Sequence, residues 1–390
     1  MKKGCRYQRY LDGPPFLRQP KPRRCVIAFV LPSYKSPDLE PFKSSPTVVF
    51  KPVATPGVAP DDYHATSVYP EYFHLRTAEW RLLEESRMDC VVVRTEDDRL
   101  QVTEFRNLKP GDQVACGRRE NGEDGIYVHT EAFEFPPHVK EKFAFRSHLT
   151  RETSFSIDYD ELYDLLGHEH EHGFILWVLG PAVVFDHDSR QAFGKLIDNG
   201  FVHGLMAGNA LATHDLEGAL FGTALGQELY AKRTVALGHY RHLDALNKIR
   251  GIGSIETAVA EGTIKDGVMR AVIRKKIPYA LAGSIRDDGP MPEVIADVYR
   301  AQDRMRNLTR KATTIVCLAT QLHSIATGNM TPSYTVSGGV VRPVYFYTVD
   351  MSEFAVSKLA DRGSLTARSI LTNVQDFVVT VERGLSKRCT

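Results

Sequence analysis

From Phe174 onward, short apolar runs alternate with segments of helical character. Short apolar runs are typical of buried strands, and strands that alternate with helices form parallel sheets covered on both faces. The sequence therefore predicts an α/β fold with a parallel sheet. The expected strands are 175–179, 202–207, 279–283, 313–320 and 344–349. The expected helices are 188–199, 243–249, 254–261, 269–275, 292–308 and 355–361, with Ser254 as a side-chain cap.

The first part of the chain has a different character. A length of 390 residues exceeds the usual size of one domain, so we expect two. An apolar run at 26–31 and short strand-like runs between Cys90 and Val114 are separated by turn residues, which predicts a β-rich unit. Residues 136–172 are charged and partly helical, so we place the boundary there, with domains at 1–150 and 151–390.

The composition argues against several classes of function. A formal net charge of +1 leaves no broad basic field for nucleic acid or an anionic membrane. No apolar run reaches about 18 residues, so no transmembrane helix is expected. Residues 1–25 are basic but lack the apolar stretch of a signal peptide, which favours an arm or packing segment, with nucleic-acid binding as the minor alternative. Six scattered cysteines without zinc-type spacing favour reduced thiols in a cytoplasmic protein, with Cys317 in the core.

The polar residues that follow the expected strands are candidates for a site, because ligands of α/β proteins bind outside the carboxyl ends of strands. The densest group is Arg286, Asp287 and Asp288, directly after the strand at 279–283. A solvated turn before a helix that starts near Pro292 is the alternative, since acids are favoured there. The other polar residues at strand ends are Gly208, Asn209, His214, Asp215, Thr320, Gln321, His323, Ser324, Asn329 and Asp350.

Some of these residues suggest particular chemistry. His323 can relay protons near neutral pH. Asp350, at the tip of a strand, can accept hydrogen bonds from ribose hydroxyls or cap a helix. Glycines such as Gly208 let a backbone approach phosphates. The GxGxxG and GxxxxGK[ST] patterns are absent in the required context, so a dinucleotide would need a variant of the usual fingerprint.

The run from His168 to His172, with the sequence HEHEH, has two interpretations. As a strand it would place three histidines on one face, which suits a metal ion. As a polar segment just before a buried strand, it is a solvated charged linker. We favour the linker and expect no metal.

Several stretches between residues 180 and 364 have the character of family motifs. They are 180–184 (GPAVV), 207–212 (AGNALA), 214–217 (HDLE), 219–223 (ALFGT), 281–290 (LAGSIRDDGP), 322–326 (LHSIA), 328–330 (GNM) and 358–364 (KLADRGS). Together they resemble the archaeal-type ornithine cyclodeaminase family, also named for a region of lysine–oxoglutarate reductase/saccharopine dehydrogenases. The chain is also similar to the C-terminal part of cyanobacterial bifunctional arginine-degrading enzymes. The resemblance covers roughly residues 88–385.

The resemblance implies NAD-dependent conversion of L-ornithine to L-proline and ammonia. It also implies a C-terminal, Rossmann-like NAD-binding domain similar to deoxyhypusine synthase, and a smaller N-terminal α/β domain on the substrate side. Such a reaction needs a cation for the α-carboxylate, for which Arg286 is suited, an acid near the amines such as Asp287, and a proton relay at His323 or His214. The NAD contacts implied by the resemblance are Asn209, Ala210, Asp288, Thr320, Gln321, Leu322, His323, Asp350, Asn373 and Val374.

The chain departs from the family pattern in residues 1–70, in a longer segment at 333–349, and at Asn373, where an acid is expected. The domain that removes the guanidine group is missing from this sequence, so arginine hydrolysis is not expected. Two alternatives stay open: another NAD-linked amino-acid or imine oxidoreductase, and an NAD-binding protein without catalysis. We expect a homodimer or homotetramer.

Overall fold

A seven-stranded parallel sheet forms the centre of the protein, in a computed structural model that describes residues 29–77, 79–134, 155–287, 289–352 and 365–388. The strands lie in the order β16-β15-β12-β11-β17-β20-β21, and all neighbours are parallel. This confirms the predicted parallel α/β sheet. The strands are β11 (Ile175–Leu179), β12 (Gly204–Gly208), β15 (Tyr279–Ala282), β16 (Val294–Ile295), β17 (Thr314–Leu318), β20 (Tyr345–Asp350) and β21 (Ala367–Leu371).

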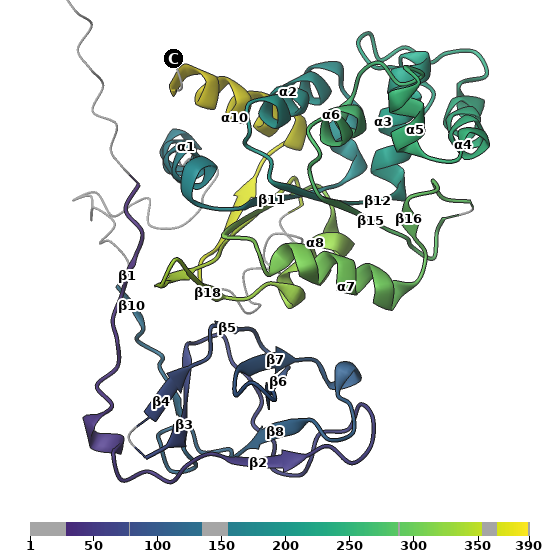
Figure 1. Cartoon of the computed structure of the whole chain (residues 1–390). Helices are drawn as coiled ribbons and strands as arrows, with labels where there is room; N and C mark the ends of the chain where they lie inside the picture. Colours follow the sequence, from purple (N-terminus) through teal and green to yellow (C-terminus); the bar gives the residue numbers. More distant parts are fainter. Residues whose placement is uncertain (1–28, 78, 135–154, 288, 353–364, 389–390) are drawn as a thin grey trace, which may run out of the picture.

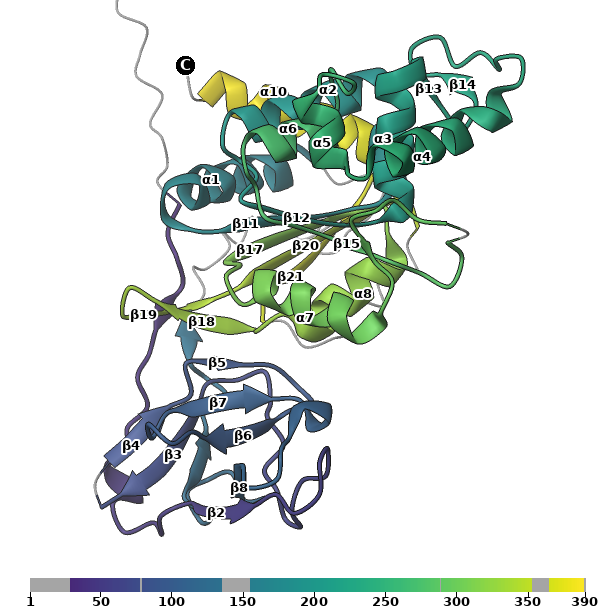
Figure 2. The same cartoon turned by 45° about the vertical axis from the view of Figure 1, so that its right-hand side comes forward.

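Helices cover both faces of the sheet (Figures 1 and 2). On one side lie α7 (Val298–Thr309) and α8 (Gln321–Met330). The other side carries α1 (Phe155–His172), α2 (His187–Asp198), α3 (Asn209–Phe221), α4 (Arg241–Ile252), α5 (Ile255–Ala260), α6 (Val268–Arg274) and α10 (Val374–Arg388). Within the described part of the chain, none of the helices has the length and apolar character to span a membrane.

Alternation along the central strand explains the two layers of core. Ile175, Trp177 and Leu179 of β11 join the apolar cluster under the larger group of helices. Leu176 and Val178 point the opposite way and join the cluster that contains α7. Because successive strand side chains alternate between faces, a strand buried on both sides must be apolar throughout, as this one is.

The N-terminal part is β-rich, as predicted, but the α/β character implied by the resemblance is not seen in the described residues 29–77 and 79–134. The helical content of these residues is limited to two 3-10 turns at Glu40–Phe42 and Phe105–Asn107. Its strands form a four-stranded sheet (β2-β8-β6-β7), a three-stranded sheet (β4-β3-β9) and the pair β1-β10. Their bounds are β1 (Ser33–Tyr34), β2 (Val49–Pro52), β3 (Glu71–Arg76), β4 (Glu79–Leu82), β5 (Glu85–Ser86), β6 (Val91–Arg94), β7 (Leu100–Thr103), β8 (Gln113–Cys116), β9 (Ile126–Val128) and β10 (Phe133–Glu134). The domain boundary near residue 150 stays a prediction, because residues 135–154 lie outside the described ranges.

A hairpin joins the two parts of the molecule. It consists of β18 (Tyr334–Ser337) and β19 (Val340–Pro343), with Gly338 and Gly339 in the turn at φ values of +59° and +82°. Consecutive residues with positive φ favour Gly-Gly. β18 pairs with β5 of the N-terminal part, so the segment that is longer than the family pattern connects the two parts.

Several expectations were wrong in detail. The helix expected from Pro292 begins at Val298, because residues 294–295 form the edge strand β16 and Asp297 caps the helix by accepting from the Arg300 amide at 2.7 Å. Residues 321–330, for which no helix was expected, form α8. Residues 29–31 of the expected strand at 26–31 are not in a strand, and the remainder lies outside the described residues, as does the expected helix at 355–361.

The HEHEH run is neither a loop nor a strand, but the last turn of α1. Glu169 is fully buried there and pairs with Arg342 of β19, while the Thr313 hydroxyl also donates to it. In the described ranges, no cluster of three or more His, Cys, Asp or Glu side chains has a geometry that could hold a metal ion. The run thus packs α1 against the sheet through its first glutamate.

Candidate functional site

The strand order of the sheet reverses between β11 and β17. From β11 the chain adds β12, β15 and β16 on one side, whereas β17, β20 and β21 lie on the other. In open α/β sheets, ligands bind at the carboxyl ends of the strands at such a switch point. The candidate site therefore lies where β11 ends at Leu179 and β17 ends at Leu318.

The backbones approach closely at this switch point. The Gly180 amide donates to the Leu318 carbonyl at 2.7 Å, and a Cβ on Gly180 would lie 1.9 Å from the Ala319 carbonyl oxygen. Only glycine fits there. Ala319 has a φ of +47°, a left-handed conformation that is strained for alanine. Strained backbone residues of this kind are found most often at functional sites. This close approach was not expected from the sequence, in which the available signal was a glycine directly after a buried apolar run.

Two helices begin at this edge with uncapped backbone N–H groups. α3 follows β12 directly, and α8 follows β17 after a two-residue connection. Their N-cap residues, Gly208 and Thr320, form no side-chain cap hydrogen bond. Free N–H groups at the positive end of a helix dipole suit an anion such as a phosphate. The expected cofactor residues Asn209, Ala210, Gln321 and Leu322 belong to these two first turns.

His323 lies across this edge. Its Nδ1 is 3.1 Å from the Thr320 hydroxyl, and its ring is so close to β12 that a Cβ on Gly208 would lie 2.8 Å from Cε1. Burial lowers the pKa of His323, and the Asp287 carboxylate opposes that shift only in part. The imidazole is therefore neutral at pH 7 and able to accept a proton.

The loop after β15 carries Arg286 and Asp287 to the same edge. The Asp287 carboxylate accepts from the Ser284 amide at 2.8 Å, and the Arg286 amide donates to the Ser284 hydroxyl at 3.1 Å. Asn209 anchors the far end of the loop, because its side-chain oxygen accepts from the Met291 amide at 3.0 Å. The Arg286 side chain is exposed, which leaves its guanidinium available to a ligand. Asp288 lies outside the described residues.

Asp350 and Asn373 lie at the carboxyl ends of the two strands at the far side of the sheet. Asp350 ends β20 and accepts from the Ser352 amide at 2.8 Å. Asn373 precedes α10 and accepts from the Gln375 amide at 2.8 Å, so it acts as a helix cap. An asparagine caps a helix as well as an acidic residue does. This accounts for Asn373 at a position where the family pattern has an acid. Val374 is buried beneath it.

His214 lies in a different set of contacts. Its Nδ1 is 2.9 Å from Glu217, and its ring contacts Phe185 and His242. Burial acts to raise the pKa of Glu217, but hydrogen bonds from His214, Thr223 and the following turn lower that pKa below its ordinary value. The described contacts of His214 thus tie α3 to the hairpin of β13 (Thr223–Ala224) and β14 (Gln227–Glu228) and do not include Asp287 or His323.

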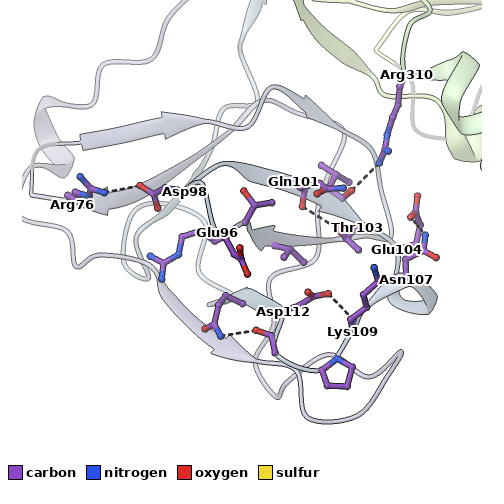
Figure 3. A pocket seen from close by; sticks show the side chains of 17 residues that line it. Arg76, Glu96, Asp98, Gln101, Thr103, Glu104, Asn107, Lys109, Asp112 and Arg310 are labelled. Atoms are coloured by element: carbon purple, nitrogen blue, oxygen red, sulfur yellow. Dashed lines mark hydrogen bonds and ion pairs between the residues drawn. The ribbon is translucent and has the colours of Figure 1, made fainter.

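A cavity of about 1090 Å³ lies elsewhere, on the N-terminal part (Figure 3). Its walls come from β6, β7 and the loop before β8. Two of its arginines are already paired, Arg76 with Asp98 at 2.9 Å and Arg310 with Glu85 at 3.1 Å. Since paired charges offer little to a ligand, we place the candidate site at the carboxyl edge of the sheet instead.

Comparison with known proteins adds a family context. A family model described as arginine dihydrolase ArgZ-like, C-terminal, Rossmann fold matches residues 162–381. The ornithine cyclodeaminase of Methanocaldococcus jannaschii is 37% identical over 352 residues, covering 87% of this chain and 78% of the relative. The bifunctional arginine dihydrolase/ornithine cyclodeaminase ArgZ of Synechocystis sp. is 33% identical over 341 residues, covering 85% of this chain and 46% of ArgZ.

Solved structures are similar as well. A conserved putative LOR/SDH protein from Methanococcus maripaludis aligns with a TM-score of 0.79 at 33% identity, covering 88% of this chain and all of that chain. AgrE, solved as a ternary complex with ornithine and NAD⁺, aligns with a TM-score of 0.56 at 32% identity, covering 89% of this chain and 47% of AgrE.

Proposed function

The chain belongs to the ornithine cyclodeaminase family that shares the ArgZ-like Rossmann domain, and from this membership we propose that it converts L-ornithine to L-proline and ammonia with NAD as cofactor. The family resemblance noted in the sequence is thereby confirmed. The observation that carries the proposal is the neutral His323, held between Thr320 and Gly208 beside Asp287 at the switch point of the sheet.

The residues at this edge fit a dinucleotide. Uncapped N–H groups of α3 and α8 suit its phosphates. The missing side chains at Gly180 and Gly208 leave room for the Ala319 carbonyl and the His323 ring, which shape this edge. The residues proposed to hold it are Asn209, Ala210, Asp288, Thr320, Gln321, Leu322, His323, Asp350, Asn373 and Val374. When bound, NAD would supply a site that accepts and returns a hydride.

The protein's own side chains have to bind the charged groups of the substrate and transfer protons. Cyclisation needs an unprotonated δ-amine, and ammonia leaves only with an added proton. A neutral His323 can take a proton in the first process and return one in the second. Arg286 is proposed to bind the substrate carboxylate, and Asp287 to hold the ammonium groups nearby. His214 is a proposed alternative relay, and residues 1–150 are proposed to cover the substrate side.

The test is to incubate the purified protein with L-ornithine and a catalytic amount of NAD⁺, and to follow proline, ammonia and NADH. Equimolar proline and ammonia without net NADH is the expected result. Net NADH formation would instead indicate another amino-acid or imine oxidoreductase. NAD binding without conversion of ornithine would exclude the proposed reaction and call for a screen of other amino acids.

A further inference from the structure

A second cavity, of about 560 Å³, lies between the N-terminal part and helices α7 and α8. One wall is a single face of α8, formed by Leu322, Ile325, Ala326 and Asn329 at helical spacing. His323 projects from a different face of this helix, towards Gly208. The cavity runs along the helix from Leu322 in its first turn to Asn329. Leu322 is also one of the residues proposed to contact the cofactor, but none of the proposed catalytic residues lines the cavity.

Buried guanidinium groups dominate the charge of this cavity. Arg87 and Arg306 are each 8% exposed, and both contact the same oxygen of Glu104, with Arg306 Nε at 2.6 Å from it. A third arginine, Arg106, forms an ion pair with Asp303, with 2.7 Å between its Nη2 and the carboxylate. Arg306 Nη1 lies farther from the same carboxylate, at 3.6 Å. Three arginines therefore share two carboxylates.

Arg306 is incompletely satisfied by this arrangement. Within the described residues, no acceptor is aligned for a hydrogen bond from its buried Nε and Nη1 atoms. Burial lowers the pKa of Arg306; Glu104 opposes that shift, but Arg87 and Arg106 add to it. A buried positive charge with incomplete compensation is costly and is relieved by an anion.

The rest of the lining complements a zwitterion with an apolar body. Asp89 is exposed at the rim, in a left-handed conformation with a φ of +64°. Phe105, Tyr299 and Leu322 contribute apolar surface. We propose that this cavity binds a free α-amino acid, with its carboxylate on Arg306 and Arg87 and its ammonium group towards Asp89.

The position of the cavity would give such binding a consequence. α8 carries both the wall of the cavity and His323, and Arg87 also donates to the Asn329 carbonyl at 3.0 Å near the end of that helix. An amino acid in the cavity would contact the N-terminal part and α8 together. It would therefore act on the placement of α8 from a site other than the proposed catalytic one.

The test is calorimetric titration of the whole protein, free of NAD, with L-ornithine, L-proline and L-arginine in separate runs. Acetate and butylamine, which carry one charge each, are the ligand controls. Two variants address the cavity: Arg306→Met removes the guanidinium, and Ala326→Phe fills the space while leaving the ion cluster intact. Arg300→Met, an exposed arginine on the same helix, and Asp287→Asn, at the edge of the sheet, are the matched controls.

At least one amino acid should bind more tightly than either control ligand. Its Kd should rise by about tenfold or more in Arg306→Met and Ala326→Phe and stay within about twofold in the two control variants. No binding by any of the three amino acids, or binding that Asp287→Asn weakens and Ala326→Phe does not, would overturn the proposal. Ala326→Phe decides the question should Arg306→Met fail to fold. Because no NAD is present, the result is independent of whether ornithine is converted.

Discussion

At the scale of single residues, the candidate site depends on how His323 is held. The imidazole is neutral because burial lowers its pKa below the ordinary value of 6.5, while Asp287 acts to raise it. A neutral ring can accept a proton, whereas a protonated one cannot. The local environment, rather than the residue type, thus decides its capacity as a base.

The pH dependence of turnover tests this environment. If His323 acts as a base, kcat should fall on the acid side as pH decreases through its pKa, at a pH below 6.5. In Asp287→Asn the group that raises this pKa is lost, so the acid limb should move to lower pH. Ornithine turnover at saturating substrate measures the limb, with the exposed, remote Glu171→Gln as the control. A shift to higher pH in Asp287→Asn would contradict the assignment.

Gly208 tests the close approach of His323 to β12. In Gly208→Ala the new Cβ would lie 2.8 Å from Cε1 of the imidazole, so the ring must move. Since small misplacement of a reacting group is costly, kcat/KM should fall by about one to two orders of magnitude. Gly194→Ala, which meets no atom within 4 Å in α2, should leave turnover unchanged. Wild-type kinetics in Gly208→Ala would remove His323 from its proposed role.

At the scale of elements, α3 and α8, whose first turns lie at the candidate site, were not among the helices expected from the sequence. α8 runs through Thr327, Gly328 and Asn329, which are weak helix formers without a regular apolar stripe. It forms because the chain leaves the buried strand β17 and the side chains of Ser324, Thr327 and Met330 are then buried by the fold. Tertiary burial thus overrides local propensity.

A buried ion cluster holds α2, α3 and α6 together. Asp215 of α3 is fully buried and accepts from Arg190 Nε at 2.7 Å, from the Val268 amide at 3.0 Å and from the Met269 amide at 2.8 Å. Asp215 was expected to be available to a ligand at a strand end, but its described partners are structural. It caps α6 and neutralises Arg190.

Asp215→Asn should therefore destabilise the protein without a specific loss of cofactor affinity. Removing one partner of a buried pair costs about 3–5 kcal/mol of unfolding free energy. Asp266→Asn, which removes the half-exposed partner of Arg190 at 2.7 Å, should cost about 1 kcal/mol or less. Urea unfolding of both variants measures the difference. Equal losses would show that burial of Asp215 does not matter energetically.

At the scale of the whole molecule, the β18–β19 hairpin connects the N-terminal part to the parallel sheet. Tyr334 is fully buried and its hydroxyl donates to the Leu83 carbonyl at 2.7 Å, while the Ser333 amide donates to Ser86 at 2.9 Å. The proposed amino-acid cavity lies at the same junction. The two parts are thus joined by backbone pairing as well as by side-chain charge.

Gly339→Val should weaken this junction. At a φ of +82° a β-branched residue is strained, by about 1–2 kcal/mol. Hydrogen exchange should accelerate at the amides of Ser333 and Val336, which donate to the N-terminal part. Gly251→Ala in α4, where a Cβ meets no atom within 4 Å, is the control. Unchanged exchange would mean that the turn does not govern the junction.

Cofactor binding should stabilise the whole molecule. A ligand that binds only the folded state adds about 2.7 kcal/mol at roughly 100 times its Kd. NAD⁺ should therefore raise Tm in a concentration-dependent way, as measured by differential scanning fluorimetry, with nicotinamide alone as the control because it lacks the phosphates. No shift at millimolar NAD⁺ would count against the cofactor assignment.

The sequence by itself determined the α/β class, the parallel sheet, its central strands and the family, because buried strands and family motifs consist of residues that are contiguous in the chain. It also placed Asp287 and His323 at strand ends, which the fold brings to one edge. Only the tertiary structure decided that His214 and Asp215 serve buried networks, that Gly180 meets Ala319, and that Arg87 and Arg306 share one carboxylate. These contacts join segments far apart in the chain, so no local sequence pattern predicts them.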